Sequence, residues 1–383
     1  MREVAIIGVG LTPVGEHWDT SLRKLAADAA GQALADAGGV QPDALYVGNA
    51  YGATISSQTQ LAALVADYAG LDGIEALGIE AAEASGAAAL RAGYLAVASG
   101  AVETALVVGA EKMTDSIGAT RVAARGVSLD ADFESAQGAT LTALAAMLMR
   151  RYMHEYGLEL DIFEGFAINA HANGARSPHA MFRNLIKPGR YAQAPMIADP
   201  INLFDSAPDA DGAAALVLTA RERAADLVPH PVHIAGSAVA TDTLALHDRA
   251  DPLYLKAAAI SAQRACQQAG IVPANADLFE LHDAFTITST LSLEAAGLAA
   301  RGEGWKLAQD GAVNLSGRVP ISTFGGLKSR GNPAGAAGVY QAVEACLQLR
   351  GAAGENQVPG ARIALIQNLG GLGSTAVTHV LRV

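Results

Sequence analysis

Two acid–base side chains stand where predicted strands end. Glu83 follows the predicted strand Gly78–Ala82 and comes just before a predicted helix, Ser85–Ser99. His282 closes another predicted strand, Leu278–His282. A carboxylate or an imidazole placed in a cleft can act as a general base. A histidine that follows a strand can equally be a structural residue, so neither side chain alone defines a site.

Two glycine-rich loops also follow or flank predicted elements. Gly325–Gly335 contains Asn332, and Asn368–Gly373 contains Gly370. Backbone amides in such loops can stabilise an oxyanion. Asn332 stands before Pro333 and could instead cap the helix that follows, because Asn suits the N-cap and Pro the first helical turn. The functional interpretation depends on all four positions occurring together.

Short β-rich runs alternate with longer Ala-rich helical runs along the chain. In the first half, for example, the strand Val4–Val9 precedes the helix Ser21–Ala37. This order predicts a parallel or mixed sheet covered by helices, an α/β fold. The turns after such strands gather at one edge of the sheet, which would bring the four positions together.

The order of elements repeats once, which indicates two fused halves. We assign residues 1–225 to the first half and residues 226–383 to the second. The first half includes an insertion at 115–200 that holds two helical blocks and an irregular tract, Ser177–Pro195. We expect this insertion to pack as a cap or lid over the first half.

Composition excludes several classes of protein. The net charge of −12 disfavours a nucleic-acid-binding protein, which would carry a basic face. Cys266 and Cys346 form no metal-binding or disulfide pattern and are predicted to be buried thiols. The acidic run Asp205–Gly212 has turn chemistry without EF-hand spacing, so no metal is expected. Gly8–Pro13 fails as a dinucleotide fingerprint because Pro13 takes the place of the third glycine.

The chain carries no membrane or export signal that we recognise. Its N-terminal apolar run is short and broken by glycine, as in a strand rather than a signal sequence. No apolar run approaches the roughly 20 residues that cross a bilayer. A reduced, cytoplasmic protein is expected.

Several longer stretches, in order, resemble the thiolase superfamily along nearly the whole chain. The similarity is strongest to the archaeal and sterol-carrier-protein types of thiolase. The stretches that carry it are Ala105–Met113, Arg151–Gly157, Asp211–Ala215, His282–Phe285, Gly325–Gly331 and Gln367–Gly373.

The resemblance implies a thiolase-like five-layered αβαβα fold of two βαβαβαββ halves plus a loop domain. It also implies dimers or tetramers, acyl-coenzyme A ligands and a place in acyl-CoA or lipid metabolism. Coenzyme A would enter as part of the substrate, with no covalently bound cofactor. Related archaeal-type proteins often work beside a small partner with a zinc ribbon and an OB fold, which implies a hetero-complex here too.

The sequence departs from the family pattern at its reactive positions. The family places a nucleophilic Cys where Glu80–Gly86 has Glu83, and an activating His where Gly331–Pro333 has Asn332. The sterol-carrier type adds a Cys where Ala284 stands. Among the acid–base and nucleophilic positions only His282 is kept, so thiolysis through an acyl-cysteine is not expected.

Three interpretations of Glu83 remain open at this point. The protein could be a non-catalytic thiolase-like subunit or scaffold, with Glu83 stabilised at a helix N-terminus. It could perform other carbon–carbon chemistry, retro-aldol cleavage or decarboxylation, with Glu83 or His282 as base and the amides of Asn332 and near Gly370 stabilising an enolate. Burial in an apolar pocket would then raise the pKa of Glu83. It could also be an acyltransferase whose Glu83 attacks the thioester.

An acidic protein that binds coenzyme A needs local positive charge for the phosphates. Arg183, Lys187 and Arg190 fall within the insertion and are predicted to supply it, although a solvated loop is the simpler interpretation. Ser322 and Phe285 are assigned with them to substrate binding.

Overall fold

The computed structural model describes all residues, 1–383, and its main feature is one nine-stranded sheet in the order β3-β2-β4-β7-β1-β8-β11-β10-β9. The first five strands of this order come from the N-terminal half and the other four from the C-terminal half. The strands are β1 (Val4–Leu11), β2 (Ala44–Gly48), β3 (Glu75–Ile79), β4 (Thr104–Glu111), β7 (Gly212–Ala220), β8 (Val232–Thr241), β9 (Leu278–Glu280), β10 (Ile363–Gly370) and β11 (Thr375–Arg382). A separate hairpin pairs β5 (Met196–Ala198) with β6 (Ile201–Asn202).

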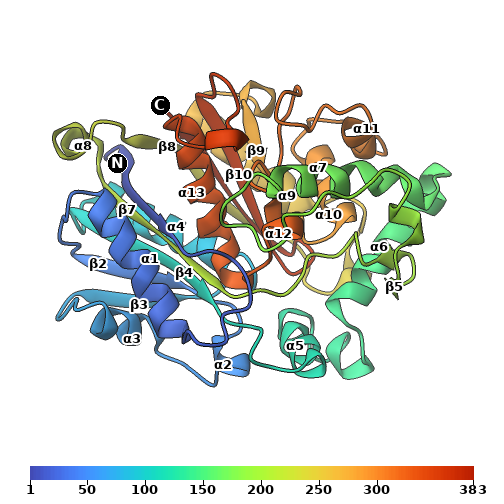
Figure 1. Cartoon of the computed structure of the whole chain (residues 1–383), viewed down its shortest axis with the longest axis horizontal. Helices are drawn as coiled ribbons and strands as arrows, with labels where there is room; N and C mark the ends of the chain where they lie inside the picture. Colours follow the sequence, from blue (N-terminus) through green and yellow to red (C-terminus); the bar gives the residue numbers. More distant parts are fainter.

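Thirteen helices surround the strands. They are α1 (Leu22–Asp36), α2 (Gly52–Ile55), α3 (Leu61–Tyr68), α4 (Ser85–Ser99), α5 (Gly118–Arg125), α6 (Leu141–Tyr156), α7 (Glu164–Gly174), α8 (Arg221–Leu227), α9 (Lys256–Ala269), α10 (Thr286–Ala295), α11 (Gly304–Gln309), α12 (Gly326–Ser329) and α13 (Ala337–Leu349). The two long helices α4 and α13 contact strands of both halves, and α13 lies between the halves in Figure 1.

The five-layer arrangement is confirmed. Helices α1 and α3 cover the outer face of the N-terminal strands, α4 and α13 form the middle layer, and α9 covers the outer face of the C-terminal strands. The two half-sheets are joined where β1 pairs with β8, from Val4 opposite Ile234 to Ile6 opposite Val232. The sheet therefore continues around the middle helices instead of ending at each half.

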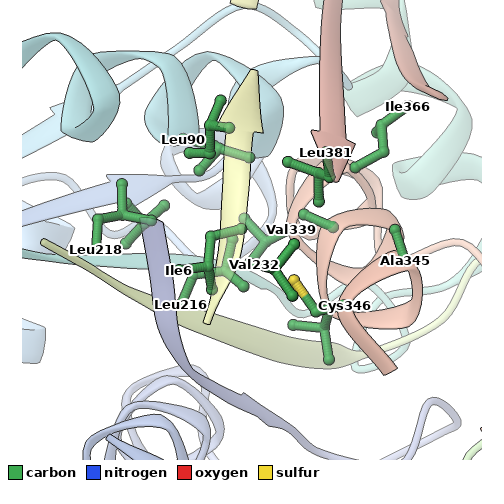
Figure 2. Close-up of a cluster of buried hydrophobic side chains, with 14 of the residues drawn as sticks. Ile6, Leu90, Leu216, Leu218, Val232, Val339, Ala345, Cys346, Ile366 and Leu381 are labelled. Atoms are coloured by element: carbon green, nitrogen blue, oxygen red, sulfur yellow. The ribbon is translucent and has the colours of Figure 1, made fainter. Parts of the chain in front are cut away.

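A large cluster of apolar side chains fills much of the space around α4 and α13. Leu90 of α4 and Val339 and Cys346 of α13 pack with strand residues such as Ile6 and Leu381 (Figure 2). Each of these side chains is almost completely buried. Because the middle helices are fixed from both sides, the turns at their N-termini are fixed as well.

The insertion lies elsewhere than we expected. Its helices α6 and α7 pack mainly on α10, α11 and α12 of the C-terminal half, as Figure 1 shows in green beside orange, and not over the first half. The reason is an apolar face on α6, where Leu141, Leu148 and Tyr152 join a core cluster with Ile287 and Leu291 of α10. Only α5 approaches the N-terminal half, beside α2.

Candidate functional site

Glu83 sits in a tight turn between β3 and α4. The strand ends at Ile79, earlier than predicted, because the turn is held by local bonds: the Ala81 N–H donates to Ser85 Oγ (2.9 Å), and the Ala82 N–H to Glu80 Oε1 (2.6 Å). Ala82 has a φ of 50°, a left-handed conformation that is strained for a residue other than glycine. Such strain is typical of residues whose neighbours are held for a function.

The Glu83 carboxylate is 1% exposed and is fully engaged by donors. Gly371 N–H donates to Oε2 (2.8 Å), the Tyr51 hydroxyl donates to Oε1, and a guanidinium nitrogen of Arg125 lies 3.7 Å from Oε1. The surroundings of Glu83 are thus polar and cationic, an environment that the sequence alone left open.

Tyr51 and Arg125 contact Glu83 and were not predicted from the sequence. Tyr51 follows β2, which lies parallel to β3, so both strands end at the same edge of the sheet. Its position after a strand could therefore have predicted that it lies near Glu83. Burial and the charge of Glu83 raise the pKa of Tyr51 well above its usual value, so its hydroxyl stays a donor. Arg125 comes from α5, where no local pattern predicted a contact with Glu83.

Arg125 is itself held by a second carboxylate. Its Nε lies 2.8 Å from Asp209 Oδ1, and Arg121 Nε lies 3.3 Å from Asp209 Oδ2. Burial alone would lower the pKa of Arg125, but the charges of Asp209 and Glu83 raise it overall. Asp209, which belongs to the acidic run Asp205–Gly212, therefore holds the guanidinium of Arg125 near Glu83.

Glu111 organises the loops around Tyr51. Its buried carboxylate accepts the N–H groups of Ala50 (2.8 Å), Tyr51 (3.2 Å) and Gly335 (3.0 Å). Burial raises the pKa of Glu111 to about 7, against the lowering effect of these donors. One carboxylate thereby ties the end of β2 to the loop that contains Asn332.

Asn332 is buried close to Asp209, the carboxylate that accepts a hydrogen bond from Arg125. Its backbone N–H donates to the Pro208 carbonyl (3.1 Å), so the expectation that this amide stabilises an oxyanion is wrong. Only the side chain of Asn332 is available for that role. The side-chain Oδ1 has no partner within the protein. The backbones of Asn332 and Asp209 form an isolated parallel β-bridge.

Gly370 ends β10 directly beside the turn of Glu83. A Cβ at this position would lie 2.5 Å from the Ala81 carbonyl oxygen, so only glycine permits the approach. The amide that reaches Glu83 belongs to the next residue, Gly371. This N–H already donates to the Glu83 carboxylate. The carboxylate oxygen therefore takes the place at which we expected a substrate oxyanion.

His282 is completely enclosed on the C-terminal side of the site. Its Nδ1 lies 3.0 Å from Asn368 Nδ2, and β9 and β10 are parallel, which explains why their ends meet. Burial lowers the pKa of His282 to about 4; Glu83 opposes this shift, and Arg125 and Arg330 add to it. The imidazole is therefore neutral at physiological pH.

The predicted substrate-binding residues do not form one cluster. Arg183, Lys187 and Arg190 are exposed, and the last two border a surface cavity with His171, Phe182 and Phe204. Ser322 is buried and donates to Asp283 Oδ2 (3.0 Å), while Phe285 packs in the core beneath the insertion. Contact of any of these residues with substrate stays a prediction.

Both cysteines lie away from Glu83. Cys346 is in the core of α13, and Cys266 lies on α9, on the opposite face of the C-terminal half-sheet from α4, where it borders a surface groove. Burial raises the pKa of Cys266 to about 11 and that of Cys346 to about 12. No cysteine lies among the residues that contact Glu83.

Comparison with known proteins gives the family. Residues 4–197 match the thiolase N-terminal domain, and residues 238–383 match the thiolase C-terminal domain-like family. The chain belongs to the thiolase family. It is 41% identical, over 99% of both chains, to an acetyl-CoA acetyltransferase of Methanothermobacter thermautotrophicus. It is also 31% identical to the benzoylsuccinyl-CoA thiolase subunit BbsB of Thauera aromatica, over 99% of this chain and 94% of that one.

A solved structure extends the comparison to an aldolase. The structure described as an Ltp2-ChsH2(DUF35) aldolase superposes with a TM-score of 0.86 at 26% identity, over 99% of this thiolase-family chain and 97% of that chain. No helix of the present chain is both long enough and apolar enough to span a membrane.

Proposed function

We propose that this thiolase-family protein cleaves or forms a carbon–carbon bond in an acyl-coenzyme A ester by retro-aldol chemistry, without an acyl-cysteine intermediate. The observation that carries the proposal is the buried Glu83 carboxylate, which is held by Tyr51 and Gly371. Glu83 occupies the turn where the family resemblance places a Cys. The likeness to a structure described as an aldolase supports the same reaction class.

In the cleavage direction Glu83 takes the proton of a β-hydroxyl group on the acyl chain. The C–O bond becomes a carbonyl as the Cα–Cβ bond breaks, and its electron pair forms the enolate of the shortened acyl-coenzyme A. The neutral His282 donates a hydrogen bond to the enolate oxygen. Protonated Glu83 then returns the proton to Cα, so that atoms and charge balance over the cycle. Decarboxylation of a β-carboxyl ester would use the same enolate stabilisation.

The second candidate is an acyltransferase in which Glu83 attacks the thioester. The name of the 41% identical relative favours it. Both carboxylate oxygens already accept hydrogen bonds, from Tyr51 and Gly371, so either reaction requires one of these bonds to be released. A non-catalytic subunit is the third possibility, since the same bonds could merely join two turns.

We also propose that the protein works as an oligomer, with a second protein as partner. The relative from Thauera is named as a subunit, and the name of the aldolase structure joins two components. A small zinc-ribbon and OB-fold protein is the kind of partner that we propose. Activity of the chain should then rise when such a partner is co-expressed and co-purified with it.

The test is turnover and intact mass with a panel of β-hydroxyacyl- and acyl-coenzyme A esters, for wild type and Glu83→Gln. The amide keeps size and shape but cannot take a proton, so turnover should fall by roughly 10²–10⁴-fold while binding is retained. A covalent acyl adduct on Glu83 would establish the acyltransferase instead. Absence of turnover in both proteins would support a non-catalytic subunit, and equal turnover in both would exclude Glu83 from the reaction.

A further inference from the structure

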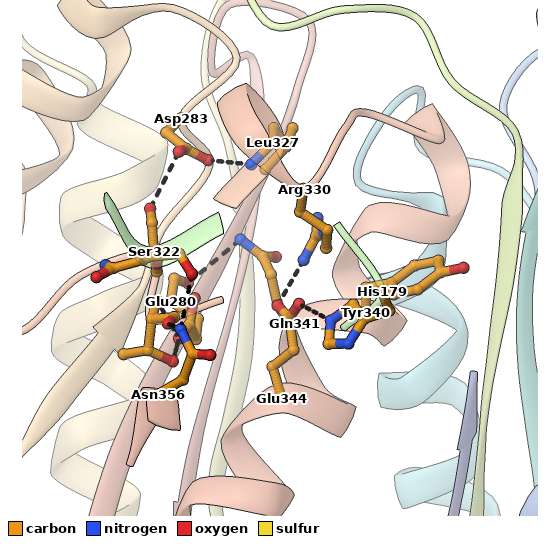
Figure 3. Close-up of polar contacts among 12 residues, drawn as sticks. His179, Glu280, Asp283, Ser322, Leu327, Arg330, Tyr340, Gln341, Glu344 and Asn356 are labelled. Atoms are coloured by element: carbon orange, nitrogen blue, oxygen red, sulfur yellow. Dashed lines mark hydrogen bonds and ion pairs between the residues drawn. The ribbon is translucent and has the colours of Figure 1, made fainter. Parts of the chain in front are cut away.

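The amide of Gln341 has only one possible orientation. This residue of α13 is 1% exposed, and its Nε2 lies 2.8 Å from the Leu281 carbonyl oxygen and 3.3 Å from that of Glu280. A third carbonyl oxygen, of Gln367, lies at 3.4 Å (Figure 3 shows Gln341 beside Glu280). Backbone carbonyls only accept hydrogen bonds, so the NH₂ end of Gln341 must face them. Its Oε1 therefore points the other way.

This orientation determines that of Asn368. Gln341 Oε1 lies 3.0 Å from Asn368 Nδ2 and can only accept, so the NH₂ group of Asn368 must be the one that faces it. The opposite orientation would set two carbonyl oxygens against each other. Asn368 is completely buried and cannot turn to solvent.

The orientation of Asn368 in turn determines the tautomer of His282. Asn368 Nδ2 lies 3.0 Å from His282 Nδ1 and donates to it, so Nδ1 must carry the lone pair. In a neutral imidazole the other nitrogen then carries the hydrogen. The neutral state agrees with burial, which keeps the pKa of His282 far below 7.

We propose that Gln341 is a positioning residue that holds His282, through Asn368, in the Nε2–H tautomer. His282 is then a hydrogen-bond donor and cannot be the base, which assigns that role to Glu83. The assignment of roles rests on the proposed function, whereas the tautomer is a property of the unliganded protein. The sequence places these three residues far apart, at 282, 341 and 368, so only the fold reveals the relay.

The tautomer can be measured directly by ¹⁵N NMR on protein labelled at its histidine rings, with the signal of His282 assigned by its loss in His282→Gln. Wild type should show a protonated Nε2 and an unprotonated Nδ1 at neutral pH. In Asn368→Asp the carboxylate only accepts, so a proton should move to Nδ1. A wild-type Nδ1–H tautomer, or an unchanged His282 signal in Asn368→Asp, would overturn the relay.

Gln341→Met tests the first member of the relay, and Gln348→Met is its matched control. Gln348 lies on the same helix, is equally buried and donates to a backbone carbonyl, of Asn356 (2.7 Å), but does not touch Asn368 or His282. Gln341→Met should release Asn368 and yield a mixed His282 tautomer, with kcat reduced about 10²-fold or more and KM little changed. Gln348→Met should leave the tautomer unchanged.

The outcomes separate this inference from the proposed function. If Gln341→Met does not fold, Asn368→Asp and the wild-type spectrum still decide the tautomer. If Glu83→Gln keeps full turnover while the His282 tautomer is as described, the proposed reaction fails and the relay stands. If the tautomer is wrong while Glu83→Gln is inactive, the relay fails and the proposed reaction stands.

Discussion

Glu83 combines two properties that a carboxylate base needs. It is shielded from solvent, and its orientation is fixed by donors to both oxygens, Tyr51 on one side and Gly371 on the other. Charge-assisted hydrogen bonds of this kind are stronger than neutral ones and fix the direction of the lone pairs. A carboxylate held in a fixed direction at this turn is what the proposed reaction requires.

Replacing Tyr51 by Phe removes one donor from Glu83 without changing the packing. We expect turnover to fall roughly 10–100-fold, the equivalent of about 1.5–3 kcal/mol for a hydrogen bond to a charged group. The loss is to be measured as a pH–rate profile of wild type and variant.

The matched control is Tyr46→Phe, since the Tyr46 hydroxyl donates to Glu75 Oε1 (2.8 Å), a carboxylate outside the site. Its turnover and pH profile should equal those of wild type. Equal losses in both variants would mean that Tyr51 acts through stability alone. The profiles are to be measured under saturating and limiting substrate.

The sequence was informative for residues at strand ends and uninformative for long-range partners. Glu83 and His282 could be predicted because strand ends meet at one sheet edge. Arg125 could not, because α5 reaches Glu83 only through its pairing with Asp209. The polarity around Glu83 could not be predicted either, since donors from distant segments supply it.

At the scale of elements, the crossing of α4 and α13 determines the position of the turn that contains Glu83. A Cβ on Gly86 would lie 2.6 Å from the Gly335 carbonyl oxygen, and one on Gly338 would lie 2.5 Å from the Ala87 nitrogen. The two helices can approach this closely only because each has glycine at the crossing. Gly86 is three residues after Glu83, so the crossing distance also sets the position of the carboxylate.

Gly86→Ala should destabilise the protein by about 1–3 kcal/mol through overpacking, measured by chemical denaturation, and should also reduce turnover. The control is Gly31→Ala on the exposed side of α1, where a Cβ meets no atom within 4 Å. That change should stabilise by about 0.5–1 kcal/mol, because glycine inside a helix costs backbone entropy. Stabilisation by both substitutions would refute the role of the crossing.

The elements themselves were largely predictable. Helix Ser85–Ser99 was predicted with the bounds it has, and most strands were found within a few residues. The location of the insertion was predicted wrongly, because local periodicity shows that α6 has an apolar face but not which half covers it. Helix α12 was missed, since its four residues lie in a glycine-rich loop.

At the scale of the whole molecule, a protein of net charge −12 must concentrate positive charge to bind a polyanion. Lys187 and Arg190 are exposed, form no ion pair and border the cavity with Phe182 and Phe204. They remain the proposed contacts for the phosphates of coenzyme A. Aromatic rings beside them could pack against the base of the nucleotide.

The double charge reversal Lys187→Glu and Arg190→Glu should weaken coenzyme A binding at least tenfold in calorimetry, and the loss should shrink at high salt. Arg264→Glu, on the exposed surface of α9, changes the charge without altering this cavity and should have little effect. Unchanged affinity in the double variant would place the phosphates elsewhere.

The central claim is that Glu83 moves protons at carbon and that no sulfur takes part. Reversal of the cleavage step requires removal of an α-proton from the shortened acyl-coenzyme A, so that step can be followed alone by deuterium exchange. Acetyl-, propionyl- and longer acyl-coenzyme A esters are incubated with protein in D₂O and analysed by mass spectrometry. We predict α-deuterium incorporation with wild type, its loss in Glu83→Gln, and an unmodified protein mass. Exchange that persists in Glu83→Gln, or an acyl group found on Cys266 or Cys346, would contradict the account.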